Sequence, residues 1–144
     1  MIGNVDLDLL EKTYQNASVG ITAIEAVLDK VKNQNFSNDL HRQLRDYQEI
    51  ADKSKRQLQM NGVRAKDVSI YNKAIMKGNV KMNLLMNSSD SHIAQMVIKG
   101  STMGVTQMTK LLHSKKKADG ASTQIAEEFV KKEESNIEVM KNYL

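Results

Sequence analysis

The 144-residue chain contains no cysteine, no proline and no tryptophan, and aromatic residues make up only 4% of it. Without cysteine, disulfides, thiolate metal ligands and thiol nucleophiles are excluded. Without proline, the chain lacks the strongest breaker of helices, so long uninterrupted helices are expected. It also has no run of 18 apolar residues and no signal-peptide pattern at its N-terminus. We therefore expect a cytoplasmic protein that has no membrane partner.

Length and composition indicate one folded domain over residues 1–144. Hydrophobic residues make up 40% of the chain and charged residues 26%, which is ordinary for a globular protein and too apolar for a disordered one. A chain of this size buries about two-thirds of the surface that its unfolded form exposes. The composition bounds the class of protein but points to no reaction.

The chain is mildly basic, with a formal net charge of +4, and its charges are unevenly distributed. No Asp or Glu occurs from residue 91 to residue 118, a stretch that includes Lys115, Lys116 and Lys117. One interpretation is an anion-binding basic patch. The other, which we favour, is lysines that complement the dipole at a helix C-terminus. This stretch lacks the aromatic and Arg residues that nucleic-acid binders usually add, so a nucleic-acid partner is not expected.

Apolar residues recur at alternating spacings of three and four along most of the chain, which is typical of amphipathic helices. Ser37 is the expected N-cap of the second helix, and Gly62 is its expected C-terminal stop. The helix that follows Gly62 is the weakest, and its expected inward residues are Tyr71, Ile75, Gly78, Met82 and Leu85. The pattern predicts helices over residues 6–33, 37–61, 67–86, 91–114 and 122–142, with breaks at 34–36, 62–66, 87–90 and 115–120.

These helices predict an all-α fold with four main helices. The link at 34–36 is short, and short links join antiparallel neighbours. The segment from Gly62 to Asp90 must then carry the chain from the first helical hairpin to the second. A single long, partly helical crossover of this kind between the second and third main helices is the ferritin-like four-helix topology.

Bundles of this type often hold two metal ions, bound by a Glu from each of two helices and a Glu-x-x-His pair from each of the other two. The only weak candidates here are Glu25 on the first helix and the pair Glu133-x-x-Asn136 on the last. Asn136 stands where a His ligand is needed, and the helix over 91–114 contains no carboxylate. We therefore predict no complete di-iron centre, no cofactor and no catalytic residue. Glu133 is instead expected in a polar layer, hydrogen-bonded to Asn136, to Gln107 or to a Tyr hydroxyl.

Gly100 and Gly104 are spaced four residues apart in the middle of the helix predicted over 91–114. The segment GSTMG follows a helical pattern and lacks the Lys-Ser/Thr of a phosphate loop. Small residues four apart on one face allow another helix to approach closely. We predict that both glycines serve helix packing within the chain, and the alternative, the seam of a homodimer, stays open.

Several segments together resemble a group of small bacterial ferritin-like proteins that is similar to a domain family of unknown function. The most specific of these segments are GSTMG and EESNIE. The resemblance covers essentially the whole chain and implies a ferritin-like four-helix bundle with a degenerate set of di-iron ligands. The segments that carry it are residues 8–10, 16–20, 91–94, 99–104 and 133–138.

These observations predict a non-catalytic bundle that acts through its surface, in a structural, scaffold or stress-associated role. One alternative is a degenerate ferritin-like metal-binding or redox protein with a partial carboxylate site near Glu25 and Glu133. A third, weaker interpretation is an accessory protein of the coat or nucleoid type that uses Lys115–Lys117.

Overall fold

The chain is an all-α protein in the computed structural model, which describes residues 3–68, 70–114 and 120–144. Helices account for 88% of this part of the chain, and it contains no strand, so the predicted all-α class is confirmed. The α-helices are α1 (Asn4–Val27), α2 (Gln34–Met60), α3 (Ile70–Met86), α4 (Asp90–Ser114) and α5 (Gly120–Met140). Two 3-10 turns, Leu28–Lys30 and Lys141–Tyr143, follow α1 and α5.

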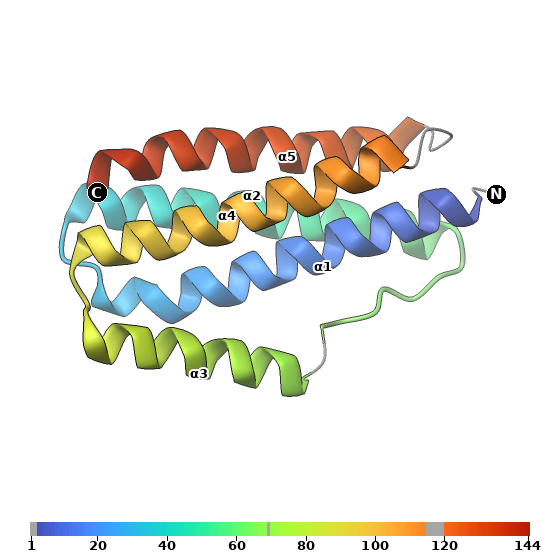
Figure 1. Ribbon diagram of the computed structural model, residues 1–144. Coiled ribbons are helices and arrows are strands. Elements are labelled where there is room, and N and C mark those ends of the chain that lie inside the picture. Colours follow the sequence, from blue (N-terminus) through green and yellow to red (C-terminus); the bar gives the residue numbers. More distant parts are fainter. Residues whose placement is uncertain (1–2, 69, 115–119) are drawn as a thin grey trace.

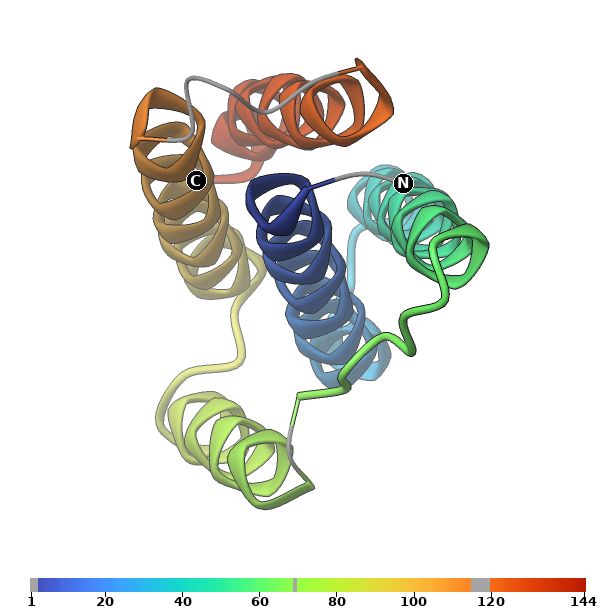
Figure 2. The same ribbon diagram turned by 90° about the vertical axis from the view of Figure 1, so that its right-hand side faces the viewer.

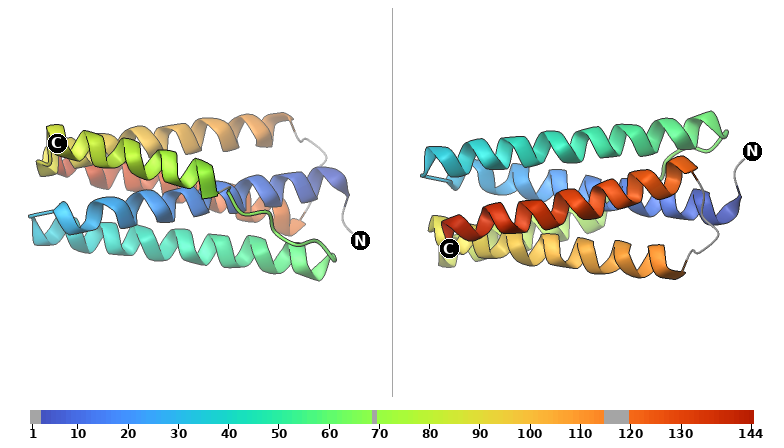
Figure 3. Two further views of the ribbon diagram at one scale, coloured as in Figure 1. Left: turned by 90° about the horizontal axis from the view of Figure 1, so that it is seen from below. Right: turned by 90° about the horizontal axis from the view of Figure 1, so that it is seen from above.

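Helices α1, α2, α4 and α5 pack side by side, and α3 lies outside them against α1 (Figures 1 and 2). The helices that follow one another, α1 with α2 and α4 with α5, form the two most extensive contacts. The two pairs then meet through α1–α5, α2–α5 and α1–α4 contacts. The chain reaches α4 from the end of α2 through α3 and its two flanking links, which run along the outside of the molecule (Figure 3).

The core lies between these four helices and is built mainly from aliphatic side chains. Helix α2 illustrates the arrangement, because Leu40, Ile50 and Leu58 are completely buried and charged residues occupy its other face. Phe36 and Phe129 are the two largest fully buried side chains. Burial of apolar surface on this scale is the main stabilising contribution to such a fold.

The turn between α1 and α2 lies at residues 31–33, three residues earlier than predicted. Helix α2 begins at Gln34, and its N-cap is Asn33, whose side chain accepts a hydrogen bond from the Phe36 N–H at 3.1 Å. The predicted break at 34–36 and the predicted cap Ser37 are therefore wrong. The reason is that Asn33 satisfies a free N–H of the first turn before Ser37 is reached.

The other described breaks follow the sequence closely. Gly62 has a positive φ of 75°, and the Val63 N–H donates to the Leu58 carbonyl, so the predicted C-terminal stop of α2 is confirmed. The break before α4 is confirmed at residues 87–89, where the Ser89 hydroxyl accepts a hydrogen bond from the His92 N–H at 3.2 Å. Residues 115–119 of the last predicted break lie outside the described residues.

Helix α3 is rotated relative to the prediction. Its side chains that pack against the core are Val80 and Leu84, whereas Ile75, Met82 and Leu85 are exposed. The prediction that the apolar set faces inward is wrong for Ile75, Gly78, Met82 and Leu85, and Tyr71 lies outside the residues whose side chains the structure describes. Since α3 has apolar residues on two opposite faces, the spacing alone did not determine which face would contact α1.

Candidate functional site

A buried polar cluster, the Glu133 cluster, lies where α2, α4 and α5 meet. It consists of Glu133 on α5, Tyr47 and Gln43 on α2, and Ser101 on α4, all of them buried. The Tyr47 hydroxyl and, at 3.4 Å, the Ser101 hydroxyl both donate to Oε1 of Glu133. This confirms the expectation that Glu133 is buried and bonded to a polar residue on another helix.

Gln43 extends the cluster and supports the donors of Glu133. Its side-chain Nε2 donates to the Tyr47 hydroxyl at 3.0 Å and lies 3.5 Å from the Ser101 hydroxyl oxygen. Gln43 therefore orients both hydroxyl groups so that their protons point at the carboxylate. Tyr47 recurs at the apolar spacing of α2, but Gln43 and Ser101 were missed because polar residues do not contribute to an apolar pattern.

The environment of Glu133 shifts its proton affinity strongly. Burial raises the pKa of the Glu133 carboxyl to about 7, although the hydrogen bonds from Tyr47 and Ser101 and the nearby Asn136 amide lower it. Burial and the neighbouring Glu133 charge also raise the pKa of Tyr47, so this hydroxyl stays protonated and remains a donor. The cluster is thus able to take up and release a proton near neutral pH.

Two glycines make room for this cluster. A Cβ added to Gly104 would lie 3.0 Å from Oε2 of Glu133 and 3.3 Å from Cζ of Phe129. A Cβ added to Gly20 on α1 would lie only 2.7 Å from atoms of the Tyr47 ring. The sequence gives no packing signal for Gly20, which belongs to the segment 16–20 that carries part of the family resemblance.

Gly100 does not share the packing role of Gly104. It is exposed, and a Cβ added there would meet nothing within 4 Å. The predicted packing role is therefore wrong for Gly100. At 100° per residue, the buried face of α4, which includes Ala94, Ser101 and Met108, is turned by about 60° from the predicted one.

The candidate metal ligands are not brought together. Glu25 is exposed on α1, whereas Glu133 is buried between α2, α4 and α5, and Asn136 is half-buried one turn further along α5. Gln107, an expected partner of Glu133, is exposed. No group of three or more His, Cys, Asp or Glu residues in the described ranges is placed to hold a metal ion. The direct neighbours of Glu133 are hydroxyl and amide groups.

The structure does not test the predicted basic patch. Lys115, Lys116 and Lys117 lie outside the described residues. The other lysines of the acid-free stretch, Lys99 and Lys110, are exposed on α4.

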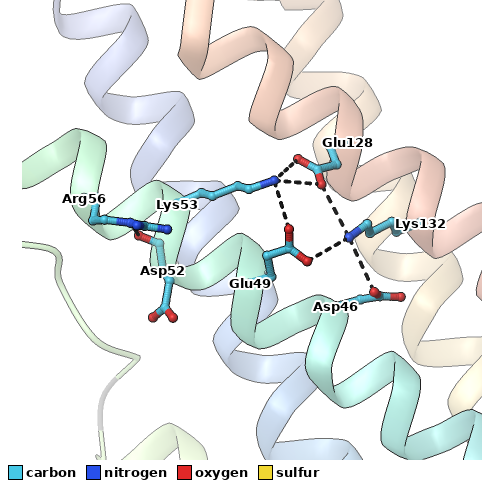
Figure 4. A network of polar contacts seen from close by, with 7 residues as sticks. All are labelled: Asp46, Glu49, Asp52, Lys53, Arg56, Glu128 and Lys132. Carbon is cyan, nitrogen blue, oxygen red and sulfur yellow. Dashed lines mark hydrogen bonds and ion pairs between the residues drawn. The ribbon is translucent and has the colours of Figure 1, made fainter.

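A network of ion pairs joins α2 to α5 on the surface (Figure 4). Lys132 lies 3.4 Å from both Asp46 and Glu128 and 3.5 Å from Glu49. Lys53 lies 3.1 Å from Glu128 and 3.2 Å from Glu49. Because the cations and carboxylates alternate and bond one another, the network links the two helices, and two cations against three carboxylates leave it a formal charge of −1.

Comparison with known proteins shows the fold of the chain and no family. No family model and no curated protein matches the sequence. Among solved structures, the chain is similar to a fragment described as DUF305 from Deinococcus radiodurans, with a TM-score of 0.75 and 11% sequence identity. The match covers 97% of this chain and 95% of the other, so the two share the arrangement of their helices throughout.

The helices were also compared with the requirements of a membrane span. Within the described residues, none combines the length and the hydropathy needed to cross a bilayer.

Proposed function

We propose that this chain is a non-catalytic helical bundle of the ferritin-like type that acts by binding another macromolecule through the outer face of α3. The observation that carries this proposal is the exposure of large apolar residues on that helix. Ile75, Met82, Leu85 and Met86 are all exposed, although the same chain buries comparable side chains efficiently in α2. Contiguous exposed apolar residues on one helix are typical of an interaction surface.

The Glu133 cluster supports a structural role for the interior. The two hydroxyl groups that donate hydrogen bonds to the carboxylate, those of Tyr47 and Ser101, belong to buried side chains, and Gln43 holds them in place. A nucleophile or general base would need access to a substrate. Glu133 is only 3% exposed, and its neighbours fill the space around it.

Photo-crosslinking in cells that produce the protein natively tests the proposed function. A photoreactive amino acid at position 82 should give a discrete adduct with another macromolecule. The same group at position 60 is the matched control, because Met60 is also exposed but lies at the end of α2. Absence of an adduct specific to position 82 would contradict the proposal.

The second candidate function is that of a degenerate metal-binding or redox protein. The observation that favours it is a buried carboxylate between three helices, the position at which such bundles carry ligands. Titration of the protein with Fe(II) and Mn(II) distinguishes the two. Stoichiometric binding that Glu133→Gln abolishes and Glu134→Gln preserves would favour the metal protein over the surface-acting bundle.

A further inference from the structure

Helix α3 carries a regular apolar stripe on the side that faces away from α1. The stripe, called here the α3 outer stripe, consists of Ile75, Gly78, Met82 and Leu85. All four are exposed, and Leu85 retains 87% of its accessible surface. Their spacing of three, four and three residues is that of a seam between two packed helices. The opposite face of α3 is already used, because Leu84 is buried there.

Contacts at both ends of the crossover hold the stripe outward. Before α3, the Tyr14 hydroxyl donates to Asp67 at 2.5 Å, and Gln15 donates to the Lys66 carbonyl at 3.4 Å. After α3, the Lys32 ammonium donates to the Ser88 carbonyl at 3.3 Å. Turning the stripe toward α1 would break these contacts and expose Leu84.

Gly78, at the centre of the stripe, is better explained by contact with a second helix than by exposure to solvent. Glycine in the middle of a helix is less stable than alanine. A Cβ added at Gly78 would meet nothing within 4 Å, so no contact within the chain requires a glycine there. The missing side chain does, however, allow the backbone of another helix to come close to the seam.

The charge around the stripe indicates the chemistry of the partner. Residues 62–89 contain five Lys or Arg and one Asp, a formal charge of +4 that equals the net charge of the whole chain. The single Asp67 is bonded to Tyr14. At 100° per residue, the exposed Lys81 lies beside the stripe, about 40° from Leu85, whereas Lys77 lies about 20° from Leu84 on the other face. A second copy of α3 would bring like charges together, whereas an acidic partner would neutralise them.

We propose that the α3 outer stripe docks an acidic amphipathic helix of a partner protein. Apolar residues at heptad spacing on that helix would pack against Ile75, Met82 and Leu85, and its flanking Asp or Glu would lie near Lys81. The narrow seam favours a helix over a lipid surface, which takes a broad apolar face. This inference rests on the proposed function and adds the chemistry of the partner.

The test uses the full-length chain and a synthetic peptide of about four heptads, with Leu at positions a and d and Glu at e and g. Calorimetric titration at low salt should show saturable binding. The double variant Met82→Gln/Leu85→Gln should bind about tenfold more weakly or worse, and the control Met60→Gln should stay within about twofold of the parent. Equal binding by the double variant and the parent would overturn the proposal.

A charge swap tests the electrostatic part separately. Lys81→Glu should lose affinity for the Glu peptide and regain it for a matched peptide with Lys at e and g. All substituted side chains are exposed, so circular dichroism should show that each variant folds as the parent does. Failure of the Lys peptide to restore binding would contradict a role of Lys81.

Other results of these experiments would assign a different binding partner to the α3 outer stripe. Binding to phosphatidylglycerol vesicles without binding to the peptide would replace the helix by a membrane surface. A dimer in sedimentation that Met82→Gln/Leu85→Gln abolishes would replace it by a second copy. If the peptide does not bind but position 82 still gives its specific adduct in cells, the acidic helix is wrong and the surface function stands. If neither occurs, both proposals fall.

Discussion

Helices α2 and α3 carry the same kind of apolar spacing and use it in opposite ways. In α2, Leu40, Tyr47 and Leu58 recur at this spacing and are buried. In α3, the predicted inward residues Ile75, Met82 and Leu85 are exposed. A heptad-like spacing therefore identifies a seam along a helix, but it does not tell whether the helix across that seam belongs to the same chain.

The other face of each helix explains the difference. The face of α2 opposite its buried residues is rich in charged side chains, such as Asp52, Lys55 and Arg56, so only one orientation buries its apolar surface. Helix α3 has Val80 and Leu84 on the face that packs against α1, opposite the outer stripe. Because either orientation buries apolar residues, the contacts of the flanking links decide between them.

The largest expected difference comes from matched truncations of one leucine in each helix. Leu40→Ala in α2 should lower the free energy of unfolding by about 2–5 kcal/mol, because it leaves a cavity in a closed core. Leu85→Ala in α3 should change it by less than about 0.5 kcal/mol, because the side chain is exposed. Urea denaturation of both variants measures the difference. A comparable loss for Leu85→Ala would show that the outer stripe is buried in the free protein.

Stability should also depend on pH through the buried face of α2, because Tyr47 of α2 contacts the titrating carboxyl of Glu133. The pKa of Glu133 is about 7 in the folded protein, above its ordinary value of 4.5. Folding therefore favours the protonated carboxyl, and its stabilisation is complete below pH 4.5 and is lost as the pH rises through 7. Relative to Glu133→Gln, the parent should lose on the order of 2–3 kcal/mol between pH 5 and pH 8.

Chemical denaturation across this pH range measures the effect. Glu134→Gln is the control, because Glu134 is the next residue along α5 and is exposed. It should retain the pH dependence of the parent. Parallel stability curves for the parent and Glu133→Gln would mean that the carboxyl titrates in the folded state as it does in the unfolded chain.

A smaller difference is expected from adding one methyl group on each side. Gly20→Ala should destabilise the fold by about 1–3 kcal/mol, because the new Cβ would overlap the Tyr47 ring. Gly78→Ala should stabilise the isolated chain by up to about 1 kcal/mol, because its Cβ enters open space and alanine is the better helix former. Thermal unfolding of the two variants should shift in opposite directions. Shifts of the same sign would show either that Gly20 does not face the Tyr47 ring or that Gly78 does not face open space.

The smallest expected change in stability comes from replacing single lysines, Lys132 in the ion-pair network between α2 and α5 and Lys77 on α3. Lys132→Met removes the cation that bridges α2 and α5 and should cost less than about 1 kcal/mol. That loss should shrink as the salt concentration rises. Lys77→Met on α3 should change stability by less than this at any salt concentration. The test is a denaturation midpoint at two ionic strengths, and a salt-independent loss for Lys132→Met would mean that its aliphatic packing matters more than its charge.

The sequence predicted the helices well because caps and apolar spacing are local signals. Gly62 ended α2 as expected, since a positive φ is a property of a single residue. The turn at 31–33 was misplaced because two successive positions, Asn33 and Ser37, are good caps. The choice between them also involves Asp90, which accepts hydrogen bonds from the Lys32 and Asn33 N–H groups 57 or more positions away in sequence.

The site was predicted only in part because its geometry depends on several helices at once. Glu133 could be identified as a buried carboxylate from its place in the apolar pattern of α5. Gln43, Ser101 and Gly20 carry no such signal, and they matter because they surround Tyr47 and Glu133 in space. For α4, a rotation of about 60° was enough to move Gly100 out of the core while Gly104 stayed in it.

The attachment of α3 to the bundle mainly through α1 has a consequence for how the chain can change over time. Helices α1, α2, α4 and α5 form most of the core, so extra residues in the crossover should cost less than extra residues in α2, provided that the contacts of Val63, Ala65 and Lys66 are kept. Each doubling of a flexible loop costs only about 0.6 kcal/mol in closure entropy. Insertions and substitutions at exposed positions of the crossover should therefore be tolerated better than the same changes on the buried face of α2. Related proteins should diverge fastest in α3, so a shared architecture can serve different partners.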